Sequence, residues 1–455
     1  MQLLDLITIF IFALGIVIMG LSFSGKGRNM KSFFAAGGAV PWAMSGLSLF
    51  MGFFSAGTFV VWGSIAYSLG WIAISIQWTM AIAGFVVGFF IAPRWHKTSA
   101  LTVAEYITRR LGVNTQKTYT YLFLFISLFT TGSFLYPVAK IVEVSTGMPL
   151  DLCILLLGGF CIVYVAAGGL WAVVSTDVLQ FIILTAAVLI VVPLSFGRVG
   201  GVVNFIESIP ATYFNLVNGE YTIGFIIAFG VYNAIFLGGN WAYVQRYASV
   251  NSQSSARKVG FLFGGLYVVS AVLWMLPPMI YRIVNPSLST IDAEGAYLMM
   301  CKEVLPAGLL GLMLSGMVFA TASSLNATLN ISSGVVTNDI FKRLFPQSSD
   351  KTLMRVARIS TIIFGLLAII VALLIPLMGG IVNVVISVAA LTGVPLYLPI
   401  IWTLFSKRQT EYSVITTTLV SLGANAFFKF ITPLWGFGFN RAEEMIVGVA
   451  FPVFC

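Results

Sequence analysis

The chain has 455 residues, of which 59% are hydrophobic and only 9% are charged, and its mean hydropathy is +1.00. A water-soluble protein of this size needs many more charged residues on its surface, so the composition excludes a soluble globular protein and indicates an integral membrane protein.

Thirteen apolar runs follow one another along the chain, and a membrane-spanning helix needs about 20 mostly apolar residues. They cover approximately residues 3–23, 41–69, 70–94, 115–147, 150–168, 171–198, 221–248, 256–283, 306–336, 353–378, 379–404, 412–436 and 441–455. The first run lacks a basic segment before it and a cleavage site after it, so we expect a retained helix. The last run is too short to cross, so we expect an incomplete span. Continuous runs also argue against a β-barrel.

Basic residues gather in alternate connections between these runs. If the first helix begins outside the cell, the inner connections hold the clusters within 26–31, 94–117, 246–258, 342–358 and 407–408. Because Lys and Arg concentrate on the cytoplasmic side, this predicts a multi-pass plasma-membrane protein with its N-terminus outside. Topology therefore accounts for the net charge of +9, and no nucleic-acid partner is needed.

Two of the runs are interrupted by small residues at mid-membrane. SLFMGFFSAGTFVVWG, residues 48–63, clusters Gly, Ser and Thr, and Gly238–Asn240 interrupts the seventh run. Paired interruptions favour a transporter of inverted repeats, here 41–198 and 221–404, with its solute site between them. Residues 1–40 would be an extra helix and inner loop, and 405–455 accessory helices. Close packing of ordinary helices is the alternative.

Unwinding at Gly238–Asn240 would expose backbone donors and acceptors to a bound solute, because a regular helix would consume them. Arg246, which follows this interruption, is expected to mark the cytoplasmic surface.

Asp177 is the one carboxylate well inside a predicted span. A charge in the membrane costs at least about 2.5 kcal/mol unless a partner or water meets it. We therefore expect Asp177 to face the interior of the bundle as a cation or proton site; the alternative is a helix-end Asp satisfied by water or a nearby Arg.

A row of small and polar residues lies in GMVFATASSLNATLNISSG, residues 316–334. Ala320, Ser323, Ser324 and Ala327 share one helical face. Hydroxyl and carbonyl oxygens are hard ligands that suit a cation such as sodium. Helix packing is the alternative reading of this face.

Catalytic groups are sparse. His96 is the only histidine, and the four cysteines have no metal-binding or disulfide spacing. An intramembrane enzyme needs paired carboxylates, a His cluster or a nucleophile with its base, so we expect no enzymatic activity.

Five motifs in order resemble the sodium/solute symporter family, which includes bacterial sodium/galactose and sialic acid symporters and mammalian sodium/glucose transporters. The motifs are MKSFFAAGGAVPWAMSGLSL, LTVAEYITRRLG, GGLWAVVSTDVLQ, NWAYVQRY and ATASSLNATLN followed by TNDIFKR. The resemblance covers essentially the whole chain. It implies the all-α leucine-transporter fold: ten core helices in two five-helix inverted repeats, one extra N-terminal helix and further C-terminal helices.

The family's sodium site implies ligands from the unwound first core helix and the eighth core helix. By motif these are the backbone oxygens of Met51 and Phe54, with Ala320, Ser323 and Ser324. A second ion site in some members adds the buried Asp and further hydroxyls. Asp177 is present, but Asn326 and Ala327 stand where hydroxyls are required, so Asp177 with Asn326 would at most form a second ion site or the exit route.

The sialic acid symporters imply solute contacts from Ser55, Thr58 and Gln77. Their carboxylate-pairing Arg is missing from SLFTTGSFLYP, residues 127–137, which disfavours sialic acid. Together with Asn240, Trp241 and Tyr243, these side chains suit a neutral hydroxyl-bearing solute against aromatic rings. For Trp241 and Tyr243 an interfacial aromatic belt is the alternative.

The sequence thus predicts a monomeric, sodium-coupled symporter of a small polar solute, sugar or sugar-like. The alternatives are a sodium- or proton-coupled symporter of a small carboxylate or amino acid, and a transporter-like membrane sensor.

Overall fold

The computed structural model describes residues 2–24, 40–100, 102–164 and 170–455, and every regular element within these ranges is a helix. The expected inner loop of segment 1–40 and the end of the 150–168 run lie outside the described residues. The helices of the first part are α1 (Leu3–Ser24), α3 (Trp42–Met51), η2 (Thr58–Trp62), α4 (Gly63–Leu69), α5 (Trp71–Val86), η3 (Val87–Ile91), α6 (Ala92–Lys97), α7 (Val103–Leu111), α8 (Val113–Thr146), α9 (Leu150–Tyr164) and α10 (Leu170–Arg198).

Two short helices, α11 (Val202–Ser208) and η4 (Ala211–Phe214), lead into the second part. Its helices are α12 (Ile223–Gly239), α13 (Trp241–Ala248), α14 (Gln253–Val284), η5 (Asp292–Gly295), α15 (Ala296–Val304), α16 (Leu309–Val335), η6 (Val336–Phe341), α17 (Lys342–Leu344), α18 (Asp350–Leu374), η7 (Pro376–Met378), α19 (Ile381–Val388), η8 (Ala389–Gly393), α20 (Val394–Thr403), α21 (Glu411–Phe430), η9 (Thr432–Trp435) and α22 (Arg441–Phe454).

Six of the described helices are long and apolar enough to cross a membrane, or seven if the bent pair α12–α13 counts as one span. Shorter apolar helices account for other predicted runs, among them Leu3–Gly15, Trp42–Met51 and Leu309–Thr321. The helix bounds agree with the predicted runs, but the count of thirteen spans stays a prediction.

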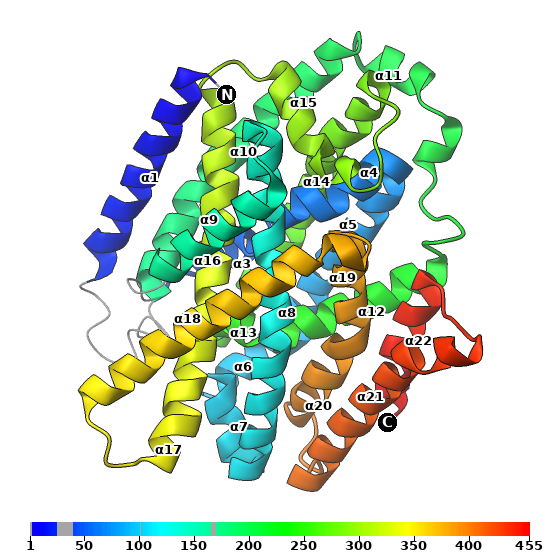
Figure 1. Ribbon diagram of the computed structural model, residues 1–455. Coiled ribbons are helices and arrows are strands. Elements are labelled where there is room, and N and C mark those ends of the chain that lie inside the picture. Colours follow the sequence, from blue (N-terminus) through cyan, green and yellow to red (C-terminus); the bar gives the residue numbers. More distant parts are fainter. Residues whose placement is uncertain (1, 25–39, 101, 165–169) are drawn as a thin grey trace.

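Small residues allow the central helices to pack closely. Helix α14 lies along α5, η3 and α3 (Figure 1). A Cβ on Gly84 would lie 2.8 Å from the Cα of Gly264, and one on Gly260 would lie 2.5 Å from the Cα of Gly88. Two glycines four residues apart on each helix therefore bring the two backbones together, as in small-residue packing of membrane helices.

The carboxylate of Asp5 links the extra N-terminal helix to the bundle by hydrogen bonds. Helix α1 packs on α16 and α10, at the edge of the bundle in Figure 1. Asp5 is buried, and its Oδ1 accepts hydrogen bonds from the backbone N–H groups of Gly308 (2.7 Å) and Gly311 (3.1 Å). The carboxylate thus satisfies donors at the start of α16 that the helix itself leaves unpaired.

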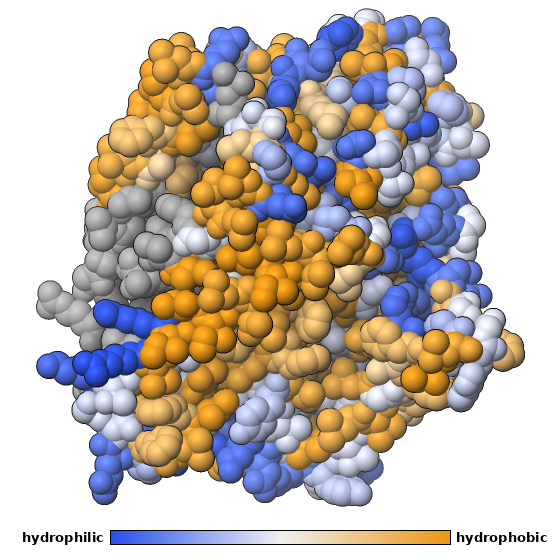
Figure 2. All heavy atoms as spheres, viewed as in Figure 1, coloured by the Kyte–Doolittle hydropathy of each residue, from blue (hydrophilic) through white to orange (hydrophobic). Residues whose placement is uncertain are grey.

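The outer surface carries long apolar stripes. Figure 2 shows hydrophobic side chains gathered over the face formed by α1 and α18. On α18, Ile359, Ile363, Leu366 and Ile370 are each more than half exposed and follow helical spacing. A broad apolar face of this kind is suited to lipid contact.

Candidate solute and cation site

The first interruption falls where the sequence predicts it. Helix α3 ends at Met51, residues 52–55 are not helical, and the chain resumes as the π-helical segment η2. Among the described residues, no donor reaches the main-chain oxygens of Met51 or Phe54. The N–H of Ala56 donates to Thr321 Oγ1 of α16 (2.9 Å), which joins this break to the helix that carries the Ser-rich face.

The second interruption is a sharp bend. Helices α12 and α13 meet at an angle of 59°, and the Asn240 side chain caps α13 by accepting from the N–H of Ala242 (3.0 Å). The carbonyl of Gly238 accepts from Trp95 Nε1 (2.7 Å), and that of Leu237 accepts from the Tyr247 hydroxyl (3.2 Å). The carbonyls of Leu237 and Gly238 are thus satisfied by the protein itself. That backbone groups at Gly238–Asn240 serve the solute stays a prediction.

The glycines at this bend have a packing role. A Cβ on Gly239 would lie 2.6 Å from the Cβ of Tyr397, and one on Gly238 would lie 2.7 Å from Ile91 Cδ1. Only glycine allows α12 to lie this close to α20 and η3. The Gly-Gly pair therefore weakens the helix and also allows it to pack closely against α20 and η3.

A cavity of about 180 Å³ lies between the first break, α5, α8, α12 and α19–η8–α20. Ser55, Thr58 and Gln77 lie on its wall, as the resemblance implies. Gln77 is 3% exposed, and its Nε2 has no hydrogen-bond partner within the described part of the chain. A buried amide donor without a partner costs about 1–3 kcal/mol, so a bound acceptor at this point would be favourable.

Several polar wall residues were missed by the sequence reasoning. Thr130, Ser133, Asn233 and Thr392 line the same cavity. Asn233 is fixed because its Nδ2 donates to Thr79 Oγ1 (2.8 Å). A single Asn or Thr in an apolar run carries no signal of its own. No charged side chain lines this cavity among the described residues.

The two aromatic residues after the second break have different places. Tyr243 lies on the wall of the cavity, as expected. Trp241 is buried and stacks on Phe123 of α8, with ring centroids 4.7 Å apart and planes 5° apart. The described cavity linings do not include Trp241, so the expectation that its ring borders the solute is not met by the geometry.

A smaller cavity of about 100 Å³ adjoins the first and shares Gly52 and Tyr243 with it. It brings together Met51, Ser324, Asp177 and Asn240, which are far apart in the sequence. Two of the predicted cation residues, Met51 of α3 and Ser324 of α16, therefore share one cavity with the buried carboxylate.

Asp177 lies in a hydrogen-bonded chain of buried side chains. The Ser48 hydroxyl donates to Asp177 Oδ2 (2.6 Å), and Arg246 Nε donates to Ser48 Oγ (3.3 Å). Arg246 also lines the smaller cavity and is only 9% exposed. The expectation that Arg246 marks the cytoplasmic surface is therefore wrong. Its guanidinium can be buried because Ser48, the Ala242 carbonyl and the nearby carboxylate offset the cost of removing its charge from water.

Of the remaining predicted sodium ligands, the structure places Phe54, Ala320 and Ser324, and the Ser324 hydroxyl donates to the Ala320 carbonyl (3.4 Å). Ala320 is buried on α16. The ring of Phe54 stacks on Trp274, with ring centroids 4.7 Å apart, so Phe54 can contribute only its main-chain oxygen to a cation. Ser324 lines the smaller cavity. The side chains of Ser323 and Asn326 lie outside the described part of the structure. Carbonyl and hydroxyl oxygens form the hard donor set that sodium requires.

A bundle with two broken helices that meet at a buried polar cavity defines a secondary membrane transporter. Comparison with known proteins is consistent with this class. The model of the sodium:solute symporter family matches residues 33–420, and the chain belongs to that family.

Relatives and solved structures agree with this assignment. A sodium/glucose cotransporter of Vibrio parahaemolyticus is 28% identical, covering 94% of this chain and 86% of that protein. Sodium/glucose cotransporter 1 of Mus musculus is 25% identical, covering 90% of this chain and 68% of that protein. The structure of a Na⁺-coupled sialic acid symporter in a substrate-bound outward-open state matches with a TM-score of 0.82 at 21% identity, covering 100% of this chain and 96% of that one. A nucleobase-cation-symport-1 family transporter matches with a TM-score of 0.59 at 14% identity, covering 94% and 93%.

The chain is therefore a multi-pass membrane transporter of leucine-transporter-like fold, helical throughout the regular elements of its described ranges, and not an enzyme.

Proposed function

We propose that this transporter couples the inward movement of sodium to the uptake of a small, uncharged, hydroxyl-bearing solute, such as a sugar or polyol. The observation that carries the choice of solute is the central cavity: its described wall has hydroxyl and amide groups, aromatic rings and no charge, and Gln77 Nε2 lies there unpaired. Polar groups of this kind recognise hydroxyl groups, whereas a carboxylate solute would call for a cationic partner.

Sodium binds, in this proposal, between the first break and α16. Its ligands are the main-chain oxygens of Met51 and Phe54, and Ala320, Ser323 and Ser324 on α16. The bond from Ala56 to Thr321 already joins the same two elements. An ion that requires both elements favours the arrangement in which they are close, and the same break supplies Ser55 and Thr58 to the solute.

Release follows when the two elements separate. Asp177 and Arg246 line the adjoining smaller cavity, where the carboxylate offers a route for the departing ion. The energetics suffice with one ion. A single sodium ion moving down 100 mV supplies about 2.3 kcal/mol, and a tenfold concentration ratio adds about 1.4 kcal/mol. Together these support an accumulation of about several hundredfold for a neutral solute.

The remaining predictions fit this mechanism. We propose that residues 41–198 and 221–404 are the two inverted repeats, that the N-terminus lies outside the cell, and that the transporter works in the plasma membrane. The break in each part, at Gly52 and at Asn240, is what supports the division.

Uptake into proteoliposomes tests the proposal. Labelled sugars, polyols, small carboxylates and amino acids are offered under an inward sodium gradient, and a potassium gradient and a pH gradient serve as comparisons. We expect sodium-stimulated uptake of a neutral hydroxylated solute. Stimulation by a proton gradient alone, or uptake restricted to carboxylates or amino acids, would overturn it.

A matched pair of variants tests the cavity. Gln77→Leu removes the unpaired donor and should weaken solute binding about tenfold, because a lost hydrogen bond in a buried site costs about 1–3 kcal/mol. Ser75→Ala on the same helix is the control, since the Ser75 hydroxyl only bonds to the Trp71 carbonyl. Equal solute affinity in the two variants would remove Gln77 from the site.

A further inference from the structure

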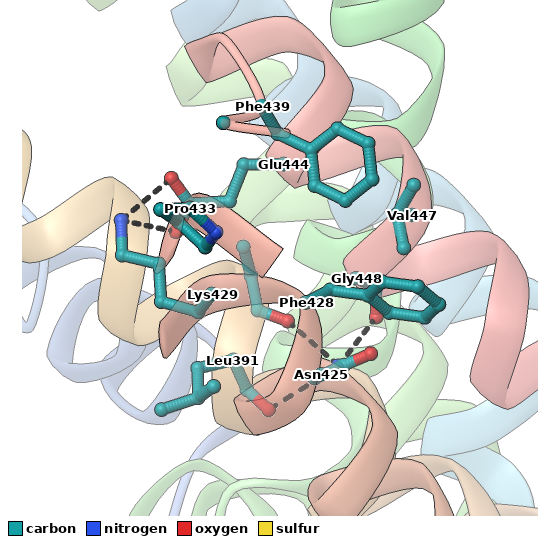
Figure 3. A pocket seen from close by; sticks show the side chains of 11 residues that line it. Leu391, Asn425, Phe428, Lys429, Pro433, Phe439, Glu444, Val447 and Gly448 are labelled. Carbon is teal, nitrogen blue, oxygen red and sulfur yellow. Dashed lines mark hydrogen bonds and ion pairs between the residues drawn. The ribbon is translucent and has the colours of Figure 1, made fainter. Parts of the chain in front are cut away.

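A third cavity, of about 290 Å³, lies outside the transport pathway, between the accessory helices α21 and α22 and the π-helical segment η8 (Figure 3). It reaches the size at which pockets begin to accept small organic groups. Nothing in the transport mechanism uses it.

Its interior carries an ion pair. Lys429 Nζ donates to Glu444 Oε2 (2.8 Å) and lies 2.7 Å from Glu444 Oε1 (Figure 3). It also donates to Ser387 Oγ (2.8 Å). Both side chains are partly buried. Lys429 Nζ therefore contacts both oxygens of Glu444. The cavity thus has one positive and one negative group, and each carboxylate oxygen has a further lone pair.

Asn425 supplies a second acceptor. Its Nδ2 donates to the carbonyls of Ala390 (3.0 Å), Gly448 (3.1 Å) and Leu391 (3.3 Å) (Figure 3). A flipped amide would put its oxygen against three carbonyl oxygens, so the orientation is fixed. Asn425 is only 4% exposed, and no described group donates to its Oδ1. A ligand that donates hydrogen bonds would satisfy this buried oxygen.

The rim of the cavity is apolar. Phe428 and Phe439 form part of the wall (Figure 3). The turn between α21 and α22 exposes Leu434 (78%), Trp435 (64%) and Phe437 (73%). Large apolar and aromatic side chains in this position are typical of the level at which a bilayer meets water.

We propose that this cavity binds the head group of an ethanolamine phospholipid from the adjoining leaflet. The primary ammonium donates to Asn425 Oδ1 and Glu444 Oε1, the phosphate faces Lys429, and the acyl chains follow the apolar rim. The zwitterionic head group matches the paired charges of the cavity, whereas a choline head group has no N–H donor for the two acceptors.

Lipid binding in this cavity would change the affinity of the transporter for its solute. Ala390 and Leu391 line the lipid cavity, whereas Ala389, Thr392 and Gly393 of the same π-helical segment line the central cavity. By linkage, a lipid that stabilises this segment changes solute affinity, and the solute changes lipid affinity by the same factor. This coupling rests on the proposed function, but lipid binding does not.

Lipid binding is tested on the full chain in detergent without sodium or solute. Phosphatidylethanolamine, phosphatidylcholine and phosphatidylglycerol with identical acyl chains are added, and thermal unfolding and native mass spectrometry report stabilisation and bound lipid. We expect the ethanolamine lipid to stabilise the protein most. Equal stabilisation by the ethanolamine and choline lipids would overturn the proposal, and because this comparison uses the unmodified protein it does not depend on any variant.

Two further experiments test where the lipid binds and whether the ligand is a lipid or a free head group. Glu444→Gln should weaken binding of the ethanolamine lipid about tenfold and leave binding of the choline lipid unchanged; unchanged preference for ethanolamine would contradict the site. Water-soluble phosphoethanolamine, added alone, should give no stabilisation. A full effect from this soluble compound would show that the ligand is not a lipid.

Discussion

The two broken helices of this transporter differ in what happens to the backbone groups that the breaks release. At the first break, the main-chain oxygens of Met51 and Phe54 have no donor among the described residues. At the second, Trp95 and Tyr247 satisfy the carbonyls of Gly238 and Leu237, and close packing holds the bend. The same sequence signal, glycine within an apolar run, thus marks a proposed ligand site in one place and a closely packed bend in the other.

This difference supports the proposal that the coupling ion binds at the first break. Unpaired oxygens in an apolar environment are costly unless a ligand meets them, and the first break is joined to α16 by the bond from the Ala56 N–H to Thr321. The second break positions Asn240 and Tyr243 beside the cavities and has few backbone acceptors left to offer. Each of the following changes should affect one break and spare the other.

The largest effect is expected from Ser324→Ala. The substitution removes a hydroxyl ligand from the proposed sodium site. A polar contact to a charged group contributes about 1.5–3 kcal/mol to the free energy of binding. The sodium concentration for half-maximal uptake should therefore rise about 10- to 100-fold. The control is Ser315→Ala on the same helix, because the Ser315 hydroxyl only bonds to the Gly311 carbonyl. An unchanged sodium dependence would exclude Ser324 as a ligand.

Gly239→Ala should destabilise the second break. Its Cβ would lie 2.6 Å from the Cβ of Tyr397, and overpacking of this kind costs about 1–3 kcal/mol. A lowered melting temperature in detergent would show it. Gly57→Ala at the first break is the matched comparison, since its nearest neighbour would be Ser55 Oγ at 3.7 Å. Equal melting temperatures would show that the second break is not held by packing.

Thr321→Ala should loosen the contact between the first break and α16. It leaves the N–H of Ala56 without its acceptor (2.9 Å), at a cost of about 1–2 kcal/mol. We expect a sodium affinity about tenfold lower in a binding assay, with partial recovery in Thr321→Ser, which restores the hydroxyl. If Thr321→Ser behaves like Thr321→Ala, the hydrogen bond does not carry the effect.

The smallest effect is expected from Tyr247→Phe. It removes only the hydroxyl that donates to the Leu237 carbonyl (3.2 Å), so the melting temperature should fall by an amount equivalent to about 1 kcal/mol. Sodium affinity should stay within about twofold of the unmodified protein. A change in sodium affinity as large as that of Ser324→Ala would contradict the separation of the two breaks.

The sequence predicts well what depends on local pattern. Apolar runs set the helix bounds, clustered Gly, Ser and Thr marked the first break, and Gly238–Asn240 marked the second, because helix length and interruption are properties of contiguous residues. The burial of Asp177 followed from the cost of a charge in the membrane.

Contacts between residues far apart in the sequence could not be predicted from local sequence patterns. Arg246 follows an apolar run and reads as a surface residue, yet it donates a hydrogen bond to Ser48, which lies 198 positions earlier. Trp241 reads as a solute contact, but Phe123 from another helix stacks on it. Asn233 and Thr392 reach the central cavity only because α12 and η8 converge there.

Hydrogen–deuterium exchange of the purified transporter, with sodium against potassium at equal ionic strength, tests the separation of the two breaks most directly. The account predicts that sodium slows exchange in peptides covering residues 50–60 and 316–328 and leaves residues 236–246 unchanged, and that Ser324→Ala abolishes this protection. Protection confined to residues 236–246, or none at the first break at saturating sodium, would contradict it.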